Sequence, residues 1–375
     1  MKKRPAKKPK KSFLFKAMPV FNFVAAVSLL LSYLAGFIDP SYFWPISFFG
    51  LAYPWLLLAN CIFILFWIFK TPVLASISAI AILLGYNLVL NAIGFRESAA
   101  IGVPKSSQSF IRVMTYNVHY FKKFDYHTDK LIKDEMLNII KQEQPDVICV
   151  QEFMTRVKGE FNTIKSLKDI LQTGHYYFEP SVDNGYEAQG LAIFSKFPIK
   201  NRGSLIFPNT IRGNEAMFAD IQTGKNTLRV YNIHLQSIAF QPEDYQYLKE
   251  VTKDIKDVQS PRRIGSRLKH AFIRRSEQAA ILKRHADSCK IPLVIAGDFN
   301  DTPTSFAVNT LSKNLKNAFR EKGSGFGITY NGDFPNFQID YILTSRNFDV
   351  KSYRIIDKKI SDHYAVRSDL ELKIR

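Results

Sequence analysis

The stretch PLVIAGDFNDTP, residues 292–303, carries the pattern that predicts the fold of most of the chain. Its first part, Leu293–Ala296, is a short apolar run of the kind found in strands that are buried on both faces. The run ends abruptly in Gly297, Asp298 and Asn300. Because residues i and i+2 of an extended chain face the same side, the carboxylate and the amide can converge on one point. Sites in open or sandwiched sheets form at strand ends, so this point is a candidate site.

The same pattern, an apolar run beside a carboxylate, an amide or a histidine, recurs along the chain. The runs and their polar residues are Val113–Tyr116 with Asn117 and His119, Val147–Val150 with Glu152, Val230–Ile233 with His234, Ile339–Leu343 with Asp340, and Tyr364–Leu370 with Asp362 and His363. A carboxylate inside a buried strand, such as Asp340, is costly unless it is paired, and His363 is an available partner. Each residue alone has an ordinary structural explanation, but the set predicts one polar site.

The chemistry of this set favours a hard divalent cation and a phosphate ester. Oxygen-rich side chains without cysteine suit Mg²⁺ or Mn²⁺ better than zinc. The chain has three cysteines, Cys61, Cys149 and Cys289, which form neither a disulfide framework nor a close pair that could begin a zinc site. Carboxylates with amides and histidines supply the charge stabilisation and the in-line water that phosphate-ester hydrolysis needs.

Helical patterns alternate with the predicted strands. Residues 129–142 have apolar side chains at helical spacing, and residues 276–286 form a second predicted helix. This alternation predicts one large α/β domain over residues 111–375. The small and polar residues 96–110 before it read as a linker.

The ordered blocks TYNVH, DVICVQE, GLAIFS, YNIHLQS, AGDFNDTP, IDYIL and SDH resemble those of the endonuclease/exonuclease/phosphatase superfamily. The resemblance covers the chain from about Ile111 to its end and excludes the apolar residues before it. It implies an α/β fold of the deoxyribonuclease-I type, a four-layer sandwich with two mixed sheets face to face and helices outside. It also implies a phosphoric ester hydrolase that depends on Mg²⁺ or Mn²⁺.

The resemblance further assigns roles in holding the metal. It implies that Glu152 is the main metal ligand and that Asn117 and Asp362 help to hold the metal or its waters. Many nucleases of this group carry an aspartate where this chain has His119, which puts a second metal in doubt. His119 is expected either to contact phosphate or to have a structural role.

Other residues are implied to act on the water and the phosphate. Asp298 and Asn300 would position the attacking water and the scissile phosphate. His363, oriented by Asp340, would contact the phosphate, and His234 would contact it from the other side. The resemblance leaves open whether Asp298 or His363 takes the proton of the water.

The first part of the chain has the composition of a membrane protein. Three uncharged runs, broken only by Asp39 and Lys70, extend from Ala17 to Phe95. Each is long enough for a helix that crosses a hydrocarbon core about 30 Å thick. We predict spans at about 19–38, 46–69 and 73–93; a cleaved signal peptide is the alternative for the first. Asn60, Asn87 and Asn91 are expected to form hydrogen bonds between these helices.

The charge pattern predicts the orientation. The chain has 51 Lys and Arg against 33 Asp and Glu, and residues 1–16 form a basic tail without an acid. By the positive-inside rule this tail is cytoplasmic, and three spans within 17–95 then place the α/β domain outside the cytoplasm. We expect an integral membrane protein of the bacterial inner-membrane type.

These inferences predict a membrane-anchored phosphoesterase and leave its substrate open. A nuclease would use the basic charge, including the segment 262–275, to capture nucleic acid. A lipid-headgroup phosphodiesterase of the sphingomyelinase type would explain the anchor, since tethering raises the local concentration of substrate. A non-catalytic binding module is disfavoured because no key residue is missing. The expected partners are the bilayer and the phosphate ester, and no protein partner is predicted.

Overall fold

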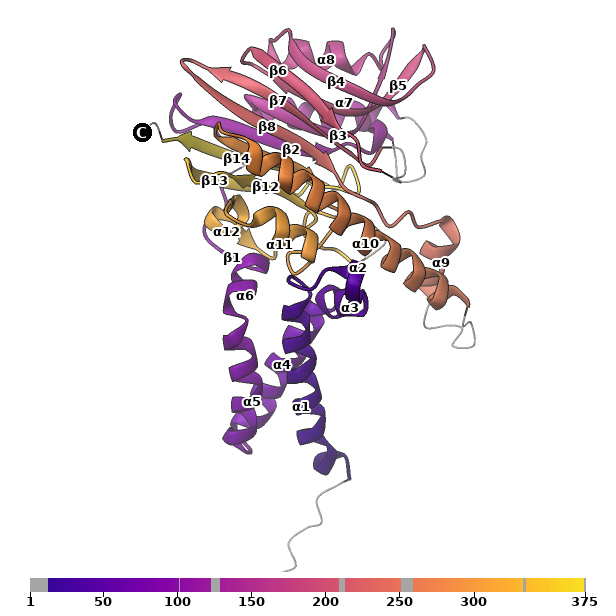
Figure 1. Ribbon diagram of the computed structural model, residues 1–375, viewed down its shortest axis with the longest axis vertical. Coiled ribbons are helices and arrows are strands. Elements are labelled where there is room, and N and C mark those ends of the chain that lie inside the picture. Colours follow the sequence, from indigo (N-terminus) through magenta and orange to yellow (C-terminus); the bar gives the residue numbers. More distant parts are fainter. Residues whose placement is uncertain are drawn as a thin grey trace, which may run out of the picture.

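A computed structural model describes residues 13–100, 102–122, 129–208, 213–250, 259–332 and 335–373. The basic tail lies almost entirely outside these residues. An α/β domain stands on a bundle of apolar helices (Figure 1).

Two mixed sheets form the centre of the α/β domain. The first has the strand order β13-β14-β2-β3-β5-β4 and the second the order β10-β12-β9-β8-β7-β6. The strands of the first sheet are β2 (Ile111–Asn117), β3 (Val147–Arg156), β4 (His175–Asp183), β5 (Glu187–Ser195), β13 (Phe348–Ile356) and β14 (Ala365–Leu372). Those of the second are β6 (Ile199–Leu205), β7 (Glu215–Thr223), β8 (Asn226–His234), β9 (Leu293–Asp298), β10 (Lys316–Asn317) and β12 (Asp340–Thr344).

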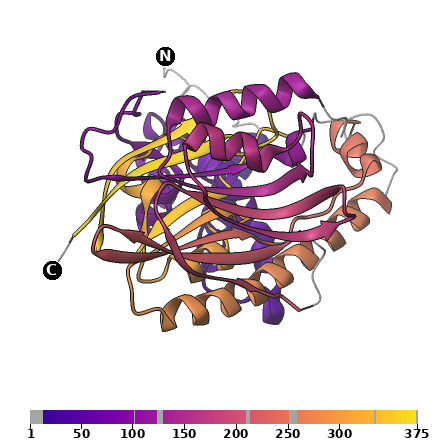
Figure 2. The same cartoon turned by 90° about the horizontal axis from the view of Figure 1, so that it is seen from above.

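The sheets pack face to face and helices cover their outer faces. Apolar side chains from both sheets, Val147, Val230 and Val294 among them, fill the space between them. Helices α7 (Lys130–Glu143) and α8 (Thr163–Leu171) pack on the first sheet, and α10 (Gln259–Ser288) and α11 (Phe306–Ser312) on the second. Figure 2 shows these helices on opposite sides of the sheets. The predicted four-layer sandwich is therefore confirmed.

Register brings the ends of several strands to one edge. β2 and β3 are parallel, with Asn117 opposite Gln151, and β8 and β9 are parallel, with His234 opposite Asp298. β12 runs antiparallel to β9, so that Asp340 at its start also lies opposite Asp298. Since the carboxyl ends of parallel strands meet at the same edge, the polar residues after these strands gather there.

The apolar helices bear out the predicted spans in part. Within the described residues, α1 (Phe13–Leu34) is long and apolar enough over residues 15–34 to cross a membrane. The other two candidates are bent pairs, α3 (Pro45–Leu51) with α4 (Tyr53–Ile68) at 61° and α5 (Pro72–Leu84) with α6 (Tyr86–Ala92) at 66°. The number of candidate membrane spans among the described residues is therefore one, or up to three if each bent pair is one span.

The two breaks have different physical causes. At the first, Pro54 lies in the first turn of α4, where its missing N–H costs nothing, while α3 turns aside to pack on the α/β domain. At the second, a Cβ on Gly85 would come within 2.2 Å of the Tyr33 ring, so any larger residue there would displace this ring. The sequence predicts a kink at Pro54 in the span 46–69, and the first break lies beside it; the break at Gly85 in the span 73–93 was not predicted.

Polar side chains in the bundle do more than join its helices. Asn60 of α4 donates to the Ala25 carbonyl of α1 at 3.0 Å, which confirms the predicted helix–helix bond. Asn87 and Asn91 instead accept hydrogen bonds from Arg320 at 2.9 and 3.3 Å. Arg320 belongs to α12 (Ala318–Lys322) of the α/β domain, so the expectation of bonds within the bundle is wrong for these two.

The bundle and the α/β domain are held together at several points. β1 (Gly94–Phe95), directly after α6, pairs with β11 (Ser324–Gly325). Thr304 donates to the Gly50 carbonyl at 2.8 Å, and Asn309 to the Gly36 carbonyl at 2.6 Å. The predicted linker is pinned to the domain as well, since Arg354 and Arg367 donate to the carbonyls of residues 99 and 100.

Candidate active site

The predicted site residues come together at the shared strand edge, around one cavity of about 320 Å³. Those that line it are Glu152, His234, Asp298, Asn300, Asp362 and His363, with His119 beside them. Asn117 and Asp340 stand directly behind, bonded to Asp298 and to His363. All eight side chains predicted to act on metal, water or phosphate thus belong to one constellation.

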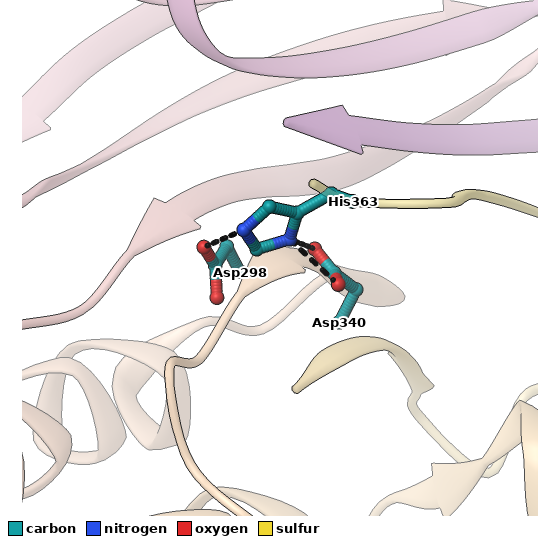
Figure 3. Close-up of side chains that lie close together, drawn as sticks. All are labelled: Asp298, Asp340 and His363. Atoms are coloured by element: carbon teal, nitrogen blue, oxygen red, sulfur yellow. Dashed lines mark hydrogen bonds and ion pairs between the residues drawn. The ribbon is translucent and has the colours of Figure 1, made fainter. Parts of the chain in front are cut away.

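His363 lies between two buried carboxylates (Figure 3). Its Nδ1 is 3.1 Å from Asp340 Oδ2, and its Nε2 is 3.6 Å from Asp298 Oδ2. Burial alone would lower the pKa of His363, but the charges of Asp340, Asp298 and Asp362 hold that pKa well above its ordinary value. The imidazolium is therefore stabilised here, and Asp340 fixes the orientation of the ring.

Several polar groups of the site surround the Asp298 carboxylate. The Asn117 amide donates to its Oδ2 at 3.1 Å, and His234 Nε2 lies 3.5 Å from the same oxygen. Burial raises the pKa of Asp298, and the nearby Asp340 charge raises it further, while His363, His234 and the Asn117 amide act against this rise. His234 is held from behind, where its Nδ1 pairs with the Gly213 carbonyl at 2.8 Å.

Glu152 reaches the cavity because β3 bulges there. Pairing with β5 shifts register between Val150 and Phe153, and Glu152 has a φ of 48°. A bulge re-aims a side chain toward a site, and this one turns the carboxylate inward. His119 Nδ1 lies 3.6 Å from both Glu152 Oε2 and Asp362 Oδ2. His119 therefore faces the two carboxylates, but it does so from a turn with a φ of 44° and not from the extended chain that the i+2 argument assumes.

Asn300 lies at the cavity in a constrained loop. Its φ is 53°, its N–H donates to Asp298 Oδ1 at 2.7 Å, and its side-chain amide donates to the Leu235 carbonyl at 3.0 Å. The amide nitrogen is thus engaged, and its oxygen is the group left to meet a ligand.

Several supporting residues were not predicted. Buried Arg275 donates to the Asn300 carbonyl and lies 3.3 Å from Asp301 Oδ1, which fastens the loop that carries Asp298. Thr329 Oγ1 accepts from the N–H of Asp340 at 3.0 Å, and the Tyr330 ring packs edge-on against His363. Asp301 was visible in the AGDFNDTP block, but nothing in the sequence singles out Arg275 within its basic run.

The donor set fits a hard divalent cation. Glu152 and Asp362 offer oxygens, the ligands that Mg²⁺ and Mn²⁺ prefer, and both carboxylates are partly exposed to the cavity. The Asn117 oxygen accepts the His119 N–H at 3.1 Å, while its amide nitrogen faces Asp298. Asp298, Asp340 and His363 also lie close enough together to hold an ion. In that second cluster His363 Nδ1 is bonded to Asp340 at 3.1 Å, whereas its Nε2 lies 3.6 Å from Asp298 Oδ2.

Much of the basic segment 262–275 is already paired. Arg263 and Arg267 form ion pairs with buried Asp244, and Arg274 pairs with Glu277. Lys269 lies over the Trp44 ring at 5.0 Å, and Arg275 is the buried residue described above. These partners reduce the charge that the segment offers to a phosphate backbone.

The α/β domain and the apolar helices each match a known family model. A family model described as the endonuclease/exonuclease/phosphatase family matches residues 114–363. A second model, described only as a domain of unknown function, matches residues 11–92. No curated protein matches the chain.

Solved structures with a similar fold cover the α/β domain. An endonuclease/exonuclease/phosphatase from Beutenbergia cavernae has a TM-score of 0.50 at 20% identity, over 70% of this chain and 72% of that one. One from Bacteroides vulgatus has a TM-score of 0.51 at 18% identity, over 70% and 99%. A functionally unknown conserved protein from Enterococcus faecalis has a TM-score of 0.51 at 16% identity, over 70% and 100%. At these identities the likeness shows the fold.

Proposed function

The chain belongs to the endonuclease/exonuclease/phosphatase family of phosphoric ester hydrolases, and on this premise we propose that it is membrane-anchored, depends on a divalent metal and cleaves its ester by in-line attack of water. The observation that carries the proposal is the convergence of the polar strand ends on one cavity. A binding module would not need a histidine held between two buried carboxylates.

Glu152 and Asp362, with the Asn117 amide, would hold the cation. Mg²⁺ or Mn²⁺ bound there would neutralise charge on the phosphate and polarise its phosphorus–oxygen bonds. The three residues come from three different segments, the end of β2, the bulge in β3 and the loop before β14, so folding assembles the donors. His119 is placed to orient the two carboxylates.

The remaining residues would act on the water and the phosphate. Asp298 at the end of β9 and Asn300 on the loop after it would position the water, whose proton would go to the Asp298–His363 pair. His363 and His234 approach Asp298 from two sides and would donate hydrogen bonds to phosphate oxygens. Asp340 keeps His363 turned toward the cavity.

We also propose that the basic tail is cytoplasmic and that the α/β domain lies outside the cytoplasm. Support comes from the charge of residues 1–16 and from the order of the helices, since three crossings would follow if the α3–α4 pair and the α5–α6 pair each form one span beside α1. The domain and the bundle lie at opposite ends of the long axis in Figure 1.

Removal of metal tests the function. We expect the purified full-length chain, assayed on bis(4-nitrophenyl) phosphate, to lose activity in a chelator and regain it with Mg²⁺ or Mn²⁺. Glu152→Gln should lower kcat/KM by about 100-fold or more, because a neutral amide holds a cation poorly. Glu135→Gln, an exposed change on α7, is the control. Full activity in the chelator, or no effect of Glu152→Gln, would refute the proposal.

A further inference from the structure

The side of the active-site cavity away from the carboxylates is apolar. Leu51 of α3, Ile238 and Phe240 of the loop after β8, Leu268 and Phe272 of α10, and Phe337 before β12 line it. We call these six residues the apolar wall. Hydrolysis of the phosphate ester does not require such a wall. The wall therefore indicates what the rest of the substrate is like.

The helix bundle contributes to this wall directly. Leu51 lies at the end of α3, and Phe48 one turn earlier packs edge-on against Phe272 with ring centroids 5.4 Å apart. Trp55, in the first turn of α4, packs in the same manner against Phe337 at 5.6 Å. The wall is therefore continuous with the helices that we place in the bilayer, and the cavity joins this apolar surface to the catalytic residues.

The two ends of the cavity differ in chemistry. At one end stand Glu152, Asp362 and His363, which suit a metal-bound phosphate. The apolar wall supplies hydrocarbon and aromatic side chains, which favour contact with apolar groups, and Arg275, Asp301 and Thr302 also line the cavity. A cavity of about 320 Å³ is within the size of small-ligand sites, about 300–1,000 Å³. An amphiphile with its phosphate at one end fits this division.

Nucleic acid fits the site less well. It would need a run of free cations along the path of its backbone. The arginines of α10 nearest the wall are instead engaged by Asp244 or buried on the catalytic loop, as Arg263, Arg267 and Arg275 show. The wall offers apolar contact where a nucleic acid would present its next charged phosphate.

We propose that the substrate is a membrane lipid whose phosphate ester adjoins its hydrocarbon chains, an inference that rests on the proposed hydrolase function. The phosphate lies against Glu152 and His363, the first carbons of the chains lie against the apolar wall, and the rest of the chains stays in the bilayer. Water adds to phosphorus and one phosphorus–oxygen ester bond breaks. One proton of the water goes to the leaving oxygen, which departs as an alcohol, and the other stays on the phosphate product.

The test compares substrates that differ in their hydrocarbon part. The full-length chain with Mg²⁺ is assayed on vesicles of phosphatidylglycerol, phosphatidylethanolamine or sphingomyelin, on a soluble dihexanoyl phospholipid, on bis(4-nitrophenyl) phosphate and on plasmid DNA. We expect at least one long-chain lipid to be cleaved at least tenfold faster than the dihexanoyl phospholipid, and DNA to be left intact. Leu51→Asn should lower the ratio of the lipid rate to the bis(4-nitrophenyl) phosphate rate about tenfold, because a hydrocarbon contact is lost.

The control is the identical substitution elsewhere. Leu131→Asn changes an exposed leucine on α7 and should leave the ratio unchanged. Phe240→Ser, in a loop, repeats the test if Leu51→Asn does not fold. Cleavage of bis(4-nitrophenyl) phosphate or DNA without any lipid, or an equal fall on all substrates in both wall variants, would overturn the lipid inference but leave the hydrolase standing. No metal-dependent hydrolysis of any substrate would overturn both.

Discussion

At the scale of single residues, backbone strain is concentrated beside the site. His119, Tyr120 and Phe121 follow one another with φ values of 44°, 55° and 55°, and Glu152 across the cavity has 48°. Left-handed backbone costs a non-glycine residue about 1 kcal/mol or more, so the surrounding fold must hold these residues in place. The strained turn directs the His119 imidazole toward Glu152 and Asp362.

We expect His119→Ala to weaken metal binding about 10- to 100-fold, the usual effect of losing a group that orients metal ligands. The measurements are the Mn²⁺ concentration for half-maximal activity and the rise in Tm that Mn²⁺ produces. His175→Ala, an exposed histidine on β4, should change neither. A lower Tm with an unchanged response to Mn²⁺ would instead assign His119 a purely structural role.

The sequence predicted the site residues that follow apolar strands. It did not predict contacts between segments that lie far apart in the chain. Asn117, Glu152, Asp298 and His363 were visible because each breaks the pattern of its strand. The bond from the Asn300 amide to the Leu235 carbonyl joins distant segments and leaves no local signal. The catalytic roles assigned to Asn117, Glu152, Asp298 and His363 stay predictions.

At the scale of elements, strand position explains which strands could be predicted. The β2, β3, β5, β8, β9, β12 and β14 strands carry apolar runs and were expected. The edge strands β4, β6 and β13 were not, because one side of an edge strand faces water and polar residues interrupt its pattern. The interior strand β7 was missed as well, because Glu215, Asp220 and Gln222 interrupt its apolar run. The predicted helix over 276–286 is only the second half of α10. The first half of α10 packs Ile264, Leu268 and Phe272 inward. The arginines between these residues in the sequence obscured their helical spacing, so this half was not predicted.

A buried ion pair joins β2 to β14. Arg112 contacts both carboxylate oxygens of Asp369, at 2.6 and 3.0 Å, and donates to the Glu143 carbonyl of α7 at 2.7 Å. Burial would raise the pKa of Asp369, but the hydrogen bonds and charge of Arg112 outweigh it and lower that pKa. The first sheet is therefore cross-linked at the edge opposite the site.

We expect Asp369→Asn to lower the free energy of unfolding at pH 7 by about 3–5 kcal/mol, because it leaves Arg112 buried without its partner. A carboxylate with a lowered folded-state pKa stabilises above its unfolded pKa, about 3.9, and that stability is lost as pH falls through the folded pKa. The difference between variant and wild type should thus shrink below about pH 4. Denaturant unfolding of the full chain across pH 3–7 measures it, with exposed Asp357→Asn as the control. A difference that is independent of pH would contradict this account.

At the scale of the whole molecule, composition predicted the division into an apolar bundle and an α/β domain. Pro54 is a local sign of the first break, but the sequence could not predict the break at Gly85 or the departure of α3 from the bundle, because these depend on partners distant in sequence. A larger residue at Gly85 would displace the ring of Tyr33, and α3 leaves the bundle because Phe48 and Leu51 pack on α10. Length and hydropathy report whether a helix could cross a bilayer and nothing about such partners.

The orientation can be measured with cysteines that a membrane-impermeant maleimide labels. We expect Lys225→Cys, in the turn between β7 and β8, to be labelled in intact cells, since the α/β domain should face outward. Lys70→Cys, between α4 and α5, should be labelled only after the membrane is opened. The wild-type chain gives the background from Cys61, Cys149 and Cys289. The reverse pattern would place the active site in the cytoplasm.

The several attachments between bundle and domain have a consequence for selectivity. β1 is paired to β11, Thr304 is bonded to Gly50, and Asn309 is bonded to Gly36. The α/β domain is therefore fixed to the bundle at several points and does not hang on a flexible tether. With the bundle in the bilayer, as proposed, the proposed catalytic residues would stand at one fixed height above the membrane. A lipid presents its ester bond at one depth, whereas a polymer in solution presents its bonds at every distance. The protein would therefore select ester bonds by their distance from the bilayer surface as well as by their chemistry.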